Sequence, residues 1–417
     1  MFTRIHAHNY RCLHAVDQSL GPFRALVGPN ASGKTTFLDV ISLLSDLMTN
    51  RGDVVAAVQK RSLDFSQLLW KGNGHSFELA LEAQIPEVVH QGMSPEWQTY
   101  SHVRYEVQIG IEENQIGLNY EYLWLMTPDD LHEPNQRTLF PAETVVRQDV
   151  ISKAGKGRKA AITKKPGGND NYYPTGRKSY KPSMKLDRQQ AALANVPADR
   201  ESFPVSTWFR DELEKGVELF VLNSQIIRQP SPPGLGKRFQ PTGANLPWVI
   251  EKLRGNPGRF EAWLNHVRTA LEDIRDITTI ERPEDRHRYL AIEYSSGASV
   301  PSWLVSDGTL RLLALTIPAY LDDLAGTFLI EEPENGIHPR AIETVLQSLS
   351  SMYGSQVLMA THSPVALNML EPADVLCFAK NNSGESDIVS GDKHPALREW
   401  KEGDPDFGTL FAAGILS

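Results

Sequence analysis

The chain of 417 residues contains only two cysteines, Cys12 and Cys377, which are too few for a disulfide framework or a thiolate metal site. Such low cysteine use is typical of a protein that works in the reducing cytoplasm. There is no run of about 18 uninterrupted apolar residues, so we expect neither a membrane-spanning helix nor a membrane partner. The first residues, Met1-Phe2-Thr3-Arg4-Ile5-His6, contain no basic-then-apolar leader, which also favours a cytoplasmic location.

The remaining composition is that of a globular protein, with 41% hydrophobic and 22% charged residues. The length allows two or three domains, or one core that carries a large insertion. The formal net charge of -9 argues against a general nucleic-acid coat protein.

Positive charge is nevertheless concentrated between Arg147 and Arg188, where 12 Lys and Arg stand against three Asp. This basic segment carries a local charge of +9, so the rest of the chain carries -18. Stretches such as Lys164-Lys165-Pro166-Gly167-Gly168 and Tyr172-Tyr173-Pro174 have the composition of a loop with interleaved aromatics. Two interpretations stay open: a surface that binds the phosphates and bases of DNA or RNA, or a solvated loop.

Residues 28–35 carry the complete pattern G-x-x-x-x-G-K-[ST] of a phosphate-binding loop. An apolar stretch, Arg24-Ala25-Leu26-Val27, precedes it as a short buried strand, and residues 37–48 keep the apolar spacing of a helix. In this setting the backbone N–H groups bind an anion, the lysine reaches the outer phosphates of a nucleotide, and the threonine ligates Mg²⁺. The loop residues are Gly28, Pro29, Asn30, Ala31, Ser32, Gly33, Lys34 and Thr35, followed by Thr36.

A second motif, Phe328-Leu329-Ile330-Glu331-Glu332, is an apolar strand that ends in two carboxylates. Consecutive strand residues point to opposite sides, so the two acids should have different roles. We expect Glu331 to hold Mg²⁺ and Glu332 to orient or deprotonate the attacking water. Glutamate stands at the first position, where the usual pattern has aspartate.

Two further motifs also stand at the end of a predicted helix or strand. Ser306-Asp307-Gly308-Thr309 opens a helix and offers a second anion site, although alone it is only a good helix cap. Thr361-His362-Ser363-Pro364 follows an apolar strand, so that His362 becomes a candidate contact to the terminal phosphate of a nucleotide.

Apolar spacing predicts further elements around these motifs. We expect antiparallel strands at Phe77–Ala83 and Val103–Ile109, two helices within Trp248–Leu271 interrupted between Gly255 and Gly258, a helix Thr309–Leu321 kinked near Pro318, strands Thr327–Ile330 and Gln356–Ala360, and a helix Arg340–Tyr353.

In this order, the phosphate loop, the helix-opening serine, the acidic strand and the histidine resemble the ATP-binding cassette (ABC) ATPases. The resemblance is to the branch that contains SMC, RecF and OLD (overcoming lysogenisation defect) proteins, and it covers roughly residues 1–80 and 220–417. Val305–Arg311 matches the signature, Ile330–Pro339 the acidic strand with its D-loop, and Ala360–Pro364 the switch histidine. The motifs Glu-Glu-Pro-Glu-Asn-Gly and Thr-His-Ser-Pro are most similar to those of OLD-type ATPases.

This resemblance implies an α/β P-loop NTPase fold, an ABC ATPase head, with an antiparallel β subdomain and an inserted helical and basic lobe. Its ligands would be ATP and Mg²⁺. Two heads of such families enclose ATP between them, so Ser306, Asp307 and Gly308 would act on the nucleotide of the partner head. The resemblance also implies that Lys34, Glu332 and His362 are catalytic, that Arg11 approaches the nucleotide, and that Gln67 is the Mg²⁺-contacting Q-loop residue, with Gln59 and Gln84 as competitors.

The resulting domain scheme has four parts. Residues 1–80 form the first part of the head with the phosphate loop, 81–220 an inserted β and basic lobe, 221–290 a helical lobe, and 291–417 the second part of the head. Full-length OLD proteins add a Toprim nuclease, but only 53 residues follow Pro364 here. Four acids near the end are too few for such a domain: Glu399, Glu402, Asp404 and Asp406.

From these features we expect an ATP-hydrolysing, dimerising switch that acts on nucleic acid or on a nuclease-like effector, by resemblance in bacterial defence against phage. A RecF-like DNA-repair ATPase is the main alternative. The nucleotide-binding subunit of a membrane transporter and a scaffold that barely hydrolyses ATP are two others.

Overall fold

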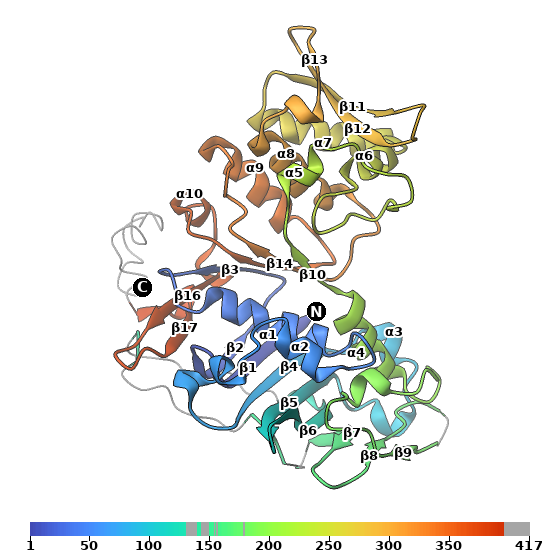
Figure 1. Ribbon diagram of the computed structural model, residues 1–417, viewed down its shortest axis with the longest axis vertical. Coiled ribbons are helices and arrows are strands. Elements are labelled where there is room, and N and C mark those ends of the chain that lie inside the picture. The colour runs from blue at the N-terminus through green and yellow to red at the C-terminus, as the bar shows by residue number, and fades with distance from the viewer. Residues whose placement is uncertain (131–139, 143–149, 154, 156, 178–179, 396–417) are drawn as a thin grey trace.

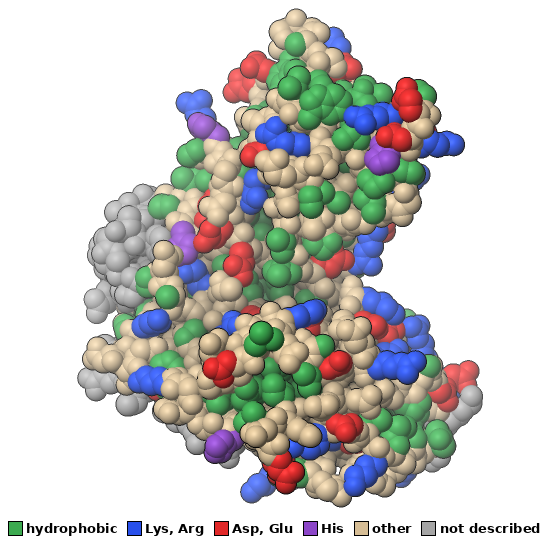
Figure 2. Space-filling model, viewed as in Figure 1, with side chains coloured by type: hydrophobic (Ala, Val, Ile, Leu, Met, Phe, Trp, Pro, Cys, Tyr) green, Lys and Arg blue, Asp and Glu red, His purple; other side chains and the backbone are tan. Residues whose placement is uncertain are grey.

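The computed structural model describes residues 1–130, 140–142, 150–153, 155, 157–177 and 180–395. The four acids between Glu399 and Asp406 therefore lie outside the described residues. Figure 1 shows a six-stranded sheet across the middle of the molecule, a helical lobe on one side of it and a large antiparallel sheet on the other. Figure 2 shows the narrowed waist between these two lobes.

The central sheet is parallel except for its last strand, β17, which pairs antiparallel with β16. The carboxyl ends of parallel strands meet at one sheet edge, so the segments that follow three of these strands come together there. The predicted strands at residues 24–27, 327–330 and 356–360 are confirmed. The strand order is β10 (Val217–Phe220), β14 (Thr327–Glu331), β15 (Gln356–Ala360), β3 (Phe23–Val27), β16 (Val375–Lys380) and β17 (Ser386–Ser390).

Both faces of the central sheet are covered. Successive side chains of each strand point to opposite faces and so pack into two different cores. In β14, Phe328 and Ile330 pack into the core of the helical lobe, while Leu329 packs into the core shared with the large sheet. Helix α1 (Lys34–Asp46) fills the space between the two sheets and buries Phe37, Val40 and Ile41 among its apolar side chains. This packing holds the loop that precedes α1 against the strand ends.

The large sheet is antiparallel, as predicted from its alternating sequence, and begins with the first residues of the chain. The expected boundary between residues 80 and 81 falls inside β4, which pairs with β1 on one side and β5 on the other. The N-terminal strands and the inserted lobe thus form one continuous sheet. Its order is β2 (Leu13–Ser19), β1 (Phe2–Tyr10), β4 (Ser76–Gln84), β5 (His102–Glu112), β6 (Gln115–Met126), β7 (Arg158–Lys164), β8 (Asp170–Tyr172) and β9 (Ser183–Met184).

Part of the basic segment forms the far edge of this sheet, which corrects the expectation of a loop. Lys164 is buried, and its Nζ lies 3.1 Å from Oδ2 of buried Asp170. The Tyr172 side chain is 1% exposed and its hydroxyl donates to the carbonyl of Ala192. A buried lysine with its own carboxylate and a buried tyrosine are structural groups. Arg147 lies outside the described residues.

The helical lobe contains the predicted pair of helices and a small antiparallel sheet that was not predicted. The break between the helices is confirmed: α6 ends at Arg254, and the Asn256 side chain caps α7. Helix α8 gives way to a 3-10 helix, Ile317–Tyr320, at the expected kink. The elements are α5 (Ser224–Ile227), α6 (Leu246–Arg254), α7 (Pro257–Ala270), β11 (Ile274–Glu281), β12 (Arg288–Tyr294), β13 (Ser299–Pro301), α8 (Asp307–Thr316), α9 (Pro339–Ser350) and α10 (Pro364–Leu367).

Three further helices lie beside the large sheet: α2 (Val54–Gln59), α3 (Glu87–His90) and α4 (Pro204–Lys215). Within the described residues, none of the helices combines the length and the apolar character that crossing a bilayer requires.

Candidate nucleotide-binding site

The phosphate loop joins β3 to α1 in a conformation that requires its two glycines. Gly28 and Gly33 have φ angles of 149° and 109°. A Cβ on Gly28 would lie 2.2 Å from the Phe378 carbonyl oxygen, and one on Gly33 would lie 2.4 Å from Ser386 Oγ. Gly33 offers no side chain to cap α1, so the first N–H groups of the helix have no side-chain cap. This glycine cradle at a helix N-terminus fits a phosphate group.

Lys34 is held inside the loop by carbonyl oxygens. Its Nζ donates to the oxygens of Gly28 and Pro29 at 2.8 and 2.9 Å, and the residue is only 7% exposed. Burial lowers the pKa of Lys34 to about 8, although the nearby carboxylates of Glu332 and Glu331 oppose this shift. Lys34 forms no ion pair within the part of the chain that the structure describes. An anion in the cradle would supply the missing partner.

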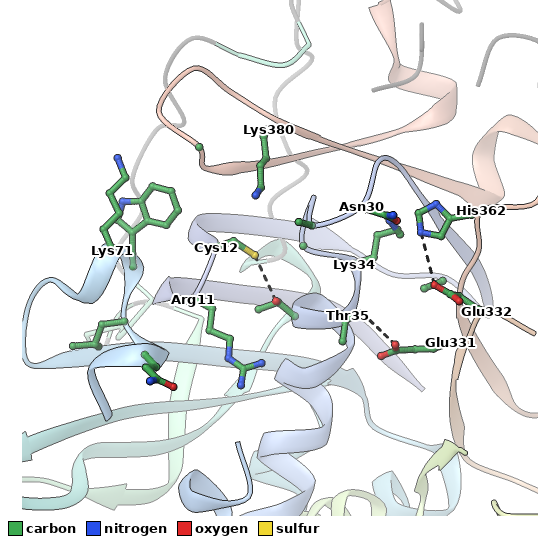
Figure 3. Close-up of a pocket in the computed structure, with 18 residues that line it drawn as sticks. Arg11, Cys12, Asn30, Lys34, Thr35, Lys71, Glu331, Glu332, His362 and Lys380 are labelled. Carbon is green, nitrogen blue, oxygen red and sulfur yellow. Dashed lines mark hydrogen bonds and ion pairs between the residues drawn. The ribbon is translucent and has the colours of Figure 1, made fainter. Parts of the chain in front are cut away.

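Thr35 and Glu331 meet at the end of the loop, where the Thr35 hydroxyl donates to Glu331 Oε2 at 3.2 Å (Figure 3). Burial raises the pKa of Glu331, and the neighbouring carboxylates Glu332 and Asp39 add to this effect. A hydroxyl and a carboxylate oxygen are ligands that Mg²⁺ prefers, and Mg²⁺ in such sites takes its remaining ligands from phosphate and water. The pair therefore fits a magnesium ion shared with a nucleotide.

Glu332 points away from Glu331 and towards His362. Its Oε1 lies 4.0 Å from His362 Nε2, and Asn335 donates to its other carboxylate oxygen. The two acids thus have different partners, as expected, but strand alternation is not the whole reason. Glu332 lies beyond the end of β14 with a φ of 45°, in the left-handed region that non-glycine residues rarely adopt. Burial and the charge of Lys34 lower the pKa of His362, so its ring is neutral at pH 7.

Glu334 is a site residue that the sequence reasoning passed over. Its Oε1 accepts hydrogen bonds from the Thr361 hydroxyl at 2.8 Å and from the backbone N–H of His362 at 2.7 Å. The carboxylate thereby ties the segment after β14 to the segment after β15. The only signal in the sequence is a third acid two positions after Glu332, which does not say what it contacts.

A cavity of about 640 Å³ unites most of the predicted site residues (Figure 3). Gln67 lines it, whereas its competitors Gln59 and Gln84 do not. The Gln67 Oε1 accepts from the Ser62 hydroxyl at 2.8 Å. The predicted residues that line the cavity are Arg11, Asn30, Ala31, Gly33, Lys34, Thr35, Thr36, Gln67, Glu331, Glu332 and His362.

The other loop residues support the cavity from behind. Gly28 and Pro29 offer their carbonyls to Lys34, and Ser32 is fully buried with an Oγ that finds no hydrogen-bond partner in the described structure.

The signature residues are not part of this cavity. Ser306 caps α8 in the helical lobe by accepting from the Thr309 N–H, and Asp307 accepts two hydrogen bonds from Arg228. A Cβ on Gly308 would meet the Gly336 carbonyl at 2.6 Å. Ser306, Asp307 and Gly308 therefore stand apart from the phosphate loop of their own chain.

A glycine cradle between a parallel strand and a helix, with an acidic strand beside it, defines an α/β P-loop nucleotide-binding fold. The family model described as "AAA domain, putative AbiEii toxin, Type IV TA system" matches residues 23–368, and the chain belongs to this family, AAA_21. The protein is therefore an ATPase of the AAA and ABC type.

A curated relative supports the resemblance to OLD proteins. The OLD nuclease of Thermus scotoductus is 50% identical to this chain over 44 residues. That segment is 11% of this chain and 8% of the nuclease, so the chain matches only a small part of the relative's length. The predicted resemblance to the OLD-like ABC ATPases is confirmed.

Two solved SMC structures are also similar over most of the chain, at 13% identity. The Smc head bound to the C-winged helix domain of ScpA has a TM-score of 0.48 and matches 93% of this chain and 96% of its own. The Smc head with an extended coiled coil, bound to the C-terminal domain of ScpA from Pyrococcus furiosus, has a TM-score of 0.47 and matches 95% and 98%.

Proposed function

We propose that this protein binds ATP with Mg²⁺ in the cavity and hydrolyses it. The observation that carries the proposal is the contact between Thr35 and Glu331, which joins the phosphate loop to the acidic strand, with Glu332 and His362 beside it. Lys34 binds the outer phosphates in place of its present carbonyl partners. When bound, Mg²⁺ neutralises phosphate charge and aligns the two outer phosphates for cleavage.

Glu332 orients the attacking water and accepts its proton, because its carboxylate lines the cavity and is held by Asn335. The His362 ring has an N–H with which to stabilise the terminal phosphate. Glu334 accepts a hydrogen bond from the His362 backbone N–H and so holds His362 beside Glu332.

We further propose that two copies of the chain complete each other's sites. Ser306, Asp307 and Gly308 lie outside their own cavity, so they can contact a nucleotide only from another head. Apolar side chains beside the motifs support such an interface: Leu304, just before the signature, is 70% exposed, and Val365, just after the switch segment, is 40% exposed.

The nucleotide cycle would act on a partner effector, and we place this activity in bacterial defence against phage. The family description names a toxin of a toxin–antitoxin system, and the curated relative is an OLD nuclease. Direct binding of nucleic acid through the basic segment is the weaker option, because Lys164 and Tyr172 are buried.

The test compares ATP turnover and molecular mass for wild type, Lys34→Ala and Glu332→Gln. We expect Lys34→Ala to lose ATP binding. Glu332→Gln should bind ATP, hydrolyse it at least about 100-fold more slowly and accumulate as a dimer when ATP and Mg²⁺ are present. Normal turnover by Glu332→Gln would remove the catalytic assignment, and a monomer under all conditions would remove the shared site.

A further inference from the structure

The cavity extends well beyond the phosphate loop, to an end that no sequence motif marks. At one end lie Glu332 and His362, and at the other Lys71, with Lys380 reaching in from β16 (Figure 3). Trp70 and Gly384 also line this outer end. Its walls come from the turn between β1 and β2, the segment before β4 and the hairpin between β16 and β17.

Hydrogen bonds join these three segments to one another and to the phosphate loop. The Arg11 N–H donates to the Leu68 carbonyl at 2.9 Å, and the Ser386 N–H donates to the Cys12 carbonyl at 3.1 Å. The Ser386 hydroxyl donates to the Ser32 carbonyl at 2.7 Å. The outer end is therefore preorganised relative to the cradle for phosphate.

Trp70 supplies a half-buried aromatic ring to this outer end. The His14 ring packs 5.6 Å from it at 30°, and His14 Nδ1 lies 2.8 Å from Glu385 Oε1, which fixes both side chains against the hairpin. Lys71 Nζ lies 5.0 Å from the centre of the Trp70 ring. A fixed indole that lines a cavity also lined by a phosphate loop can stack on a nucleobase, which would take the place of the Lys71 amine over the ring.

Lys380 supplies a free cation between the ring and the phosphate loop. It is the last residue of β16, its side chain is exposed, and its amine forms no ion pair or hydrogen bond with any residue that the structure describes. Its amine extends towards Cys12, whose thiol donates to the hydroxyl of Thr36 in the first turn of α1 (Figure 3). A cation in this position would be available to the base-proximal phosphate of a nucleotide whose outer phosphates lie on Lys34.

We propose that Trp70 stacks on the base of a bound nucleoside triphosphate and that Lys380 binds its base-proximal phosphate. This proposal rests on nucleotide binding by the phosphate loop. It adds Trp70 as the residue that distinguishes a nucleotide from an inorganic polyphosphate, and Lys380 as a further phosphate ligand. Both lie outside the family motifs: Trp70 follows α2, and Lys380 follows the switch histidine.

The experiment measures dissociation constants of the full-length chain for ATP and for tripolyphosphate, each with Mg²⁺, by calorimetry. Trp70→Ala should weaken ATP binding about tenfold, as expected for the loss of one stacked base, and leave tripolyphosphate binding unchanged. Trp70→Phe should retain most of the affinity for ATP. Lys380→Ala should weaken both ligands about fivefold, and Lys380→Arg should restore them, because the loss is of charge.

Trp248→Ala and Lys165→Ala serve as matched controls outside the cavity and should leave both constants unchanged. Equal effects of Trp70→Ala on ATP and tripolyphosphate, or no effect on ATP, would overturn the stacking role. Unchanged binding by Lys380→Ala would overturn the phosphate role. If Lys34→Ala abolishes ATP binding while Trp70→Ala and Lys380→Ala do not alter it, only this inference fails. If wild type binds neither ligand, the proposed function fails as well.

Discussion

Lys34 shows how a single buried charge can couple nucleotide binding to protons. Burial of the amine lowers its pKa to about 8, although Glu332 and Glu331 oppose this shift and two carbonyl oxygens accept its hydrogens. A bound phosphate favours the charged amine and must raise this pKa again. Binding therefore takes up protons wherever Lys34 is partly neutral in the free protein.

We expect net proton uptake on ATP binding at pH 8 that is absent at pH 6, and a decline of affinity as the pH rises above 8. The sign follows because the free protein must first protonate Lys34 at high pH, at a cost of about 1.4 kcal/mol per pH unit. Calorimetry in buffers of different ionisation enthalpy measures this uptake. Affinity that does not change between pH 7 and pH 9 would contradict the assignment.

Glu334 is a positioning residue, since it touches the Thr361 hydroxyl and the His362 N–H and not the cavity. Glu334→Ala should lower kcat about tenfold, by releasing His362 from its place beside Glu332, while KM for ATP changes little. Glu334→Gln keeps one acceptor oxygen and should recover part of the loss. An effect confined to thermal stability, with kcat unchanged, would reduce Glu334 to a structural residue.

At the scale of elements, the strands of the large sheet are joined by buried ion pairs. Arg104 of β5 donates to Glu82 of β4 at 2.6 Å and to Glu106 of its own strand at 2.6 Å. His6 of β1 lies 3.2 Å from Glu82. Burial alone would raise the pKa of Glu82, but the hydrogen bond from His6 and the charge of Arg104 outweigh it and lower the pKa to about 2.

Because this pKa lies below the ordinary value, the Glu82 carboxylate stabilises the fold above pH 4.5, and the stabilisation is lost as the pH falls towards 2. Glu82→Gln should reduce the free energy of unfolding at pH 7 by about 3 kcal/mol, since Arg104 loses one buried partner. Urea denaturation at pH 7 and pH 3 measures both effects. The control Glu112→Gln alters an exposed pair with Arg188 and should cost less than about 0.5 kcal/mol. Equal losses of unfolding free energy in the two variants would show that the buried cluster stabilises the fold no more than an exposed ion pair does.

For the whole molecule, the decisive fact is that the signature and the phosphate loop are on separate parts of one chain. Ser306 opens α8 in the helical lobe, whereas Lys34 opens α1 between the two sheets (Figure 1). Suppose that each complete site needs the phosphate loop of one chain and the signature of the other. Two variants that are defective in different halves of the site can then form one intact site between them.

We expect Glu332→Gln and Ser306→Arg each to be inactive alone and a one-to-one mixture to recover about a quarter of the wild-type turnover. Half of the randomly formed two-fold dimers would be mixed, and each mixed dimer would contain one intact site of two. A phosphate-release assay on the mixture measures this. The control is the double variant Glu332→Gln/Ser306→Arg mixed with wild type. Each mixed dimer then has one mutated half in each of its two sites, so it contains no intact site and only wild-type dimers hydrolyse ATP. Failure of the single variants to complement would place the signature outside the reaction.

The sequence by itself determined the features that depend on local chemistry. Strands β3, β14 and β15 follow from short apolar runs, the helix break near Asn256 from glycine and proline, and the loop before α1 from two glycines that no other residue could replace without clashes. Because each motif stands at the end of such an element, parallel packing was enough to predict that Lys34, Glu331 and His362 meet.

Only the tertiary structure decided which distant groups complete that site. The sequence favoured Gln67 but left Gln59 and Gln84 as competitors, and the fold placed only Gln67 at the cavity. Nothing local joins Trp70 to Lys380. Lys164 looked like a binding charge until its buried partner Asp170 was known. The neighbours and the burial of a side chain depend on the whole fold. They determine whether a charged side chain stabilises the folded protein or is available to bind a ligand.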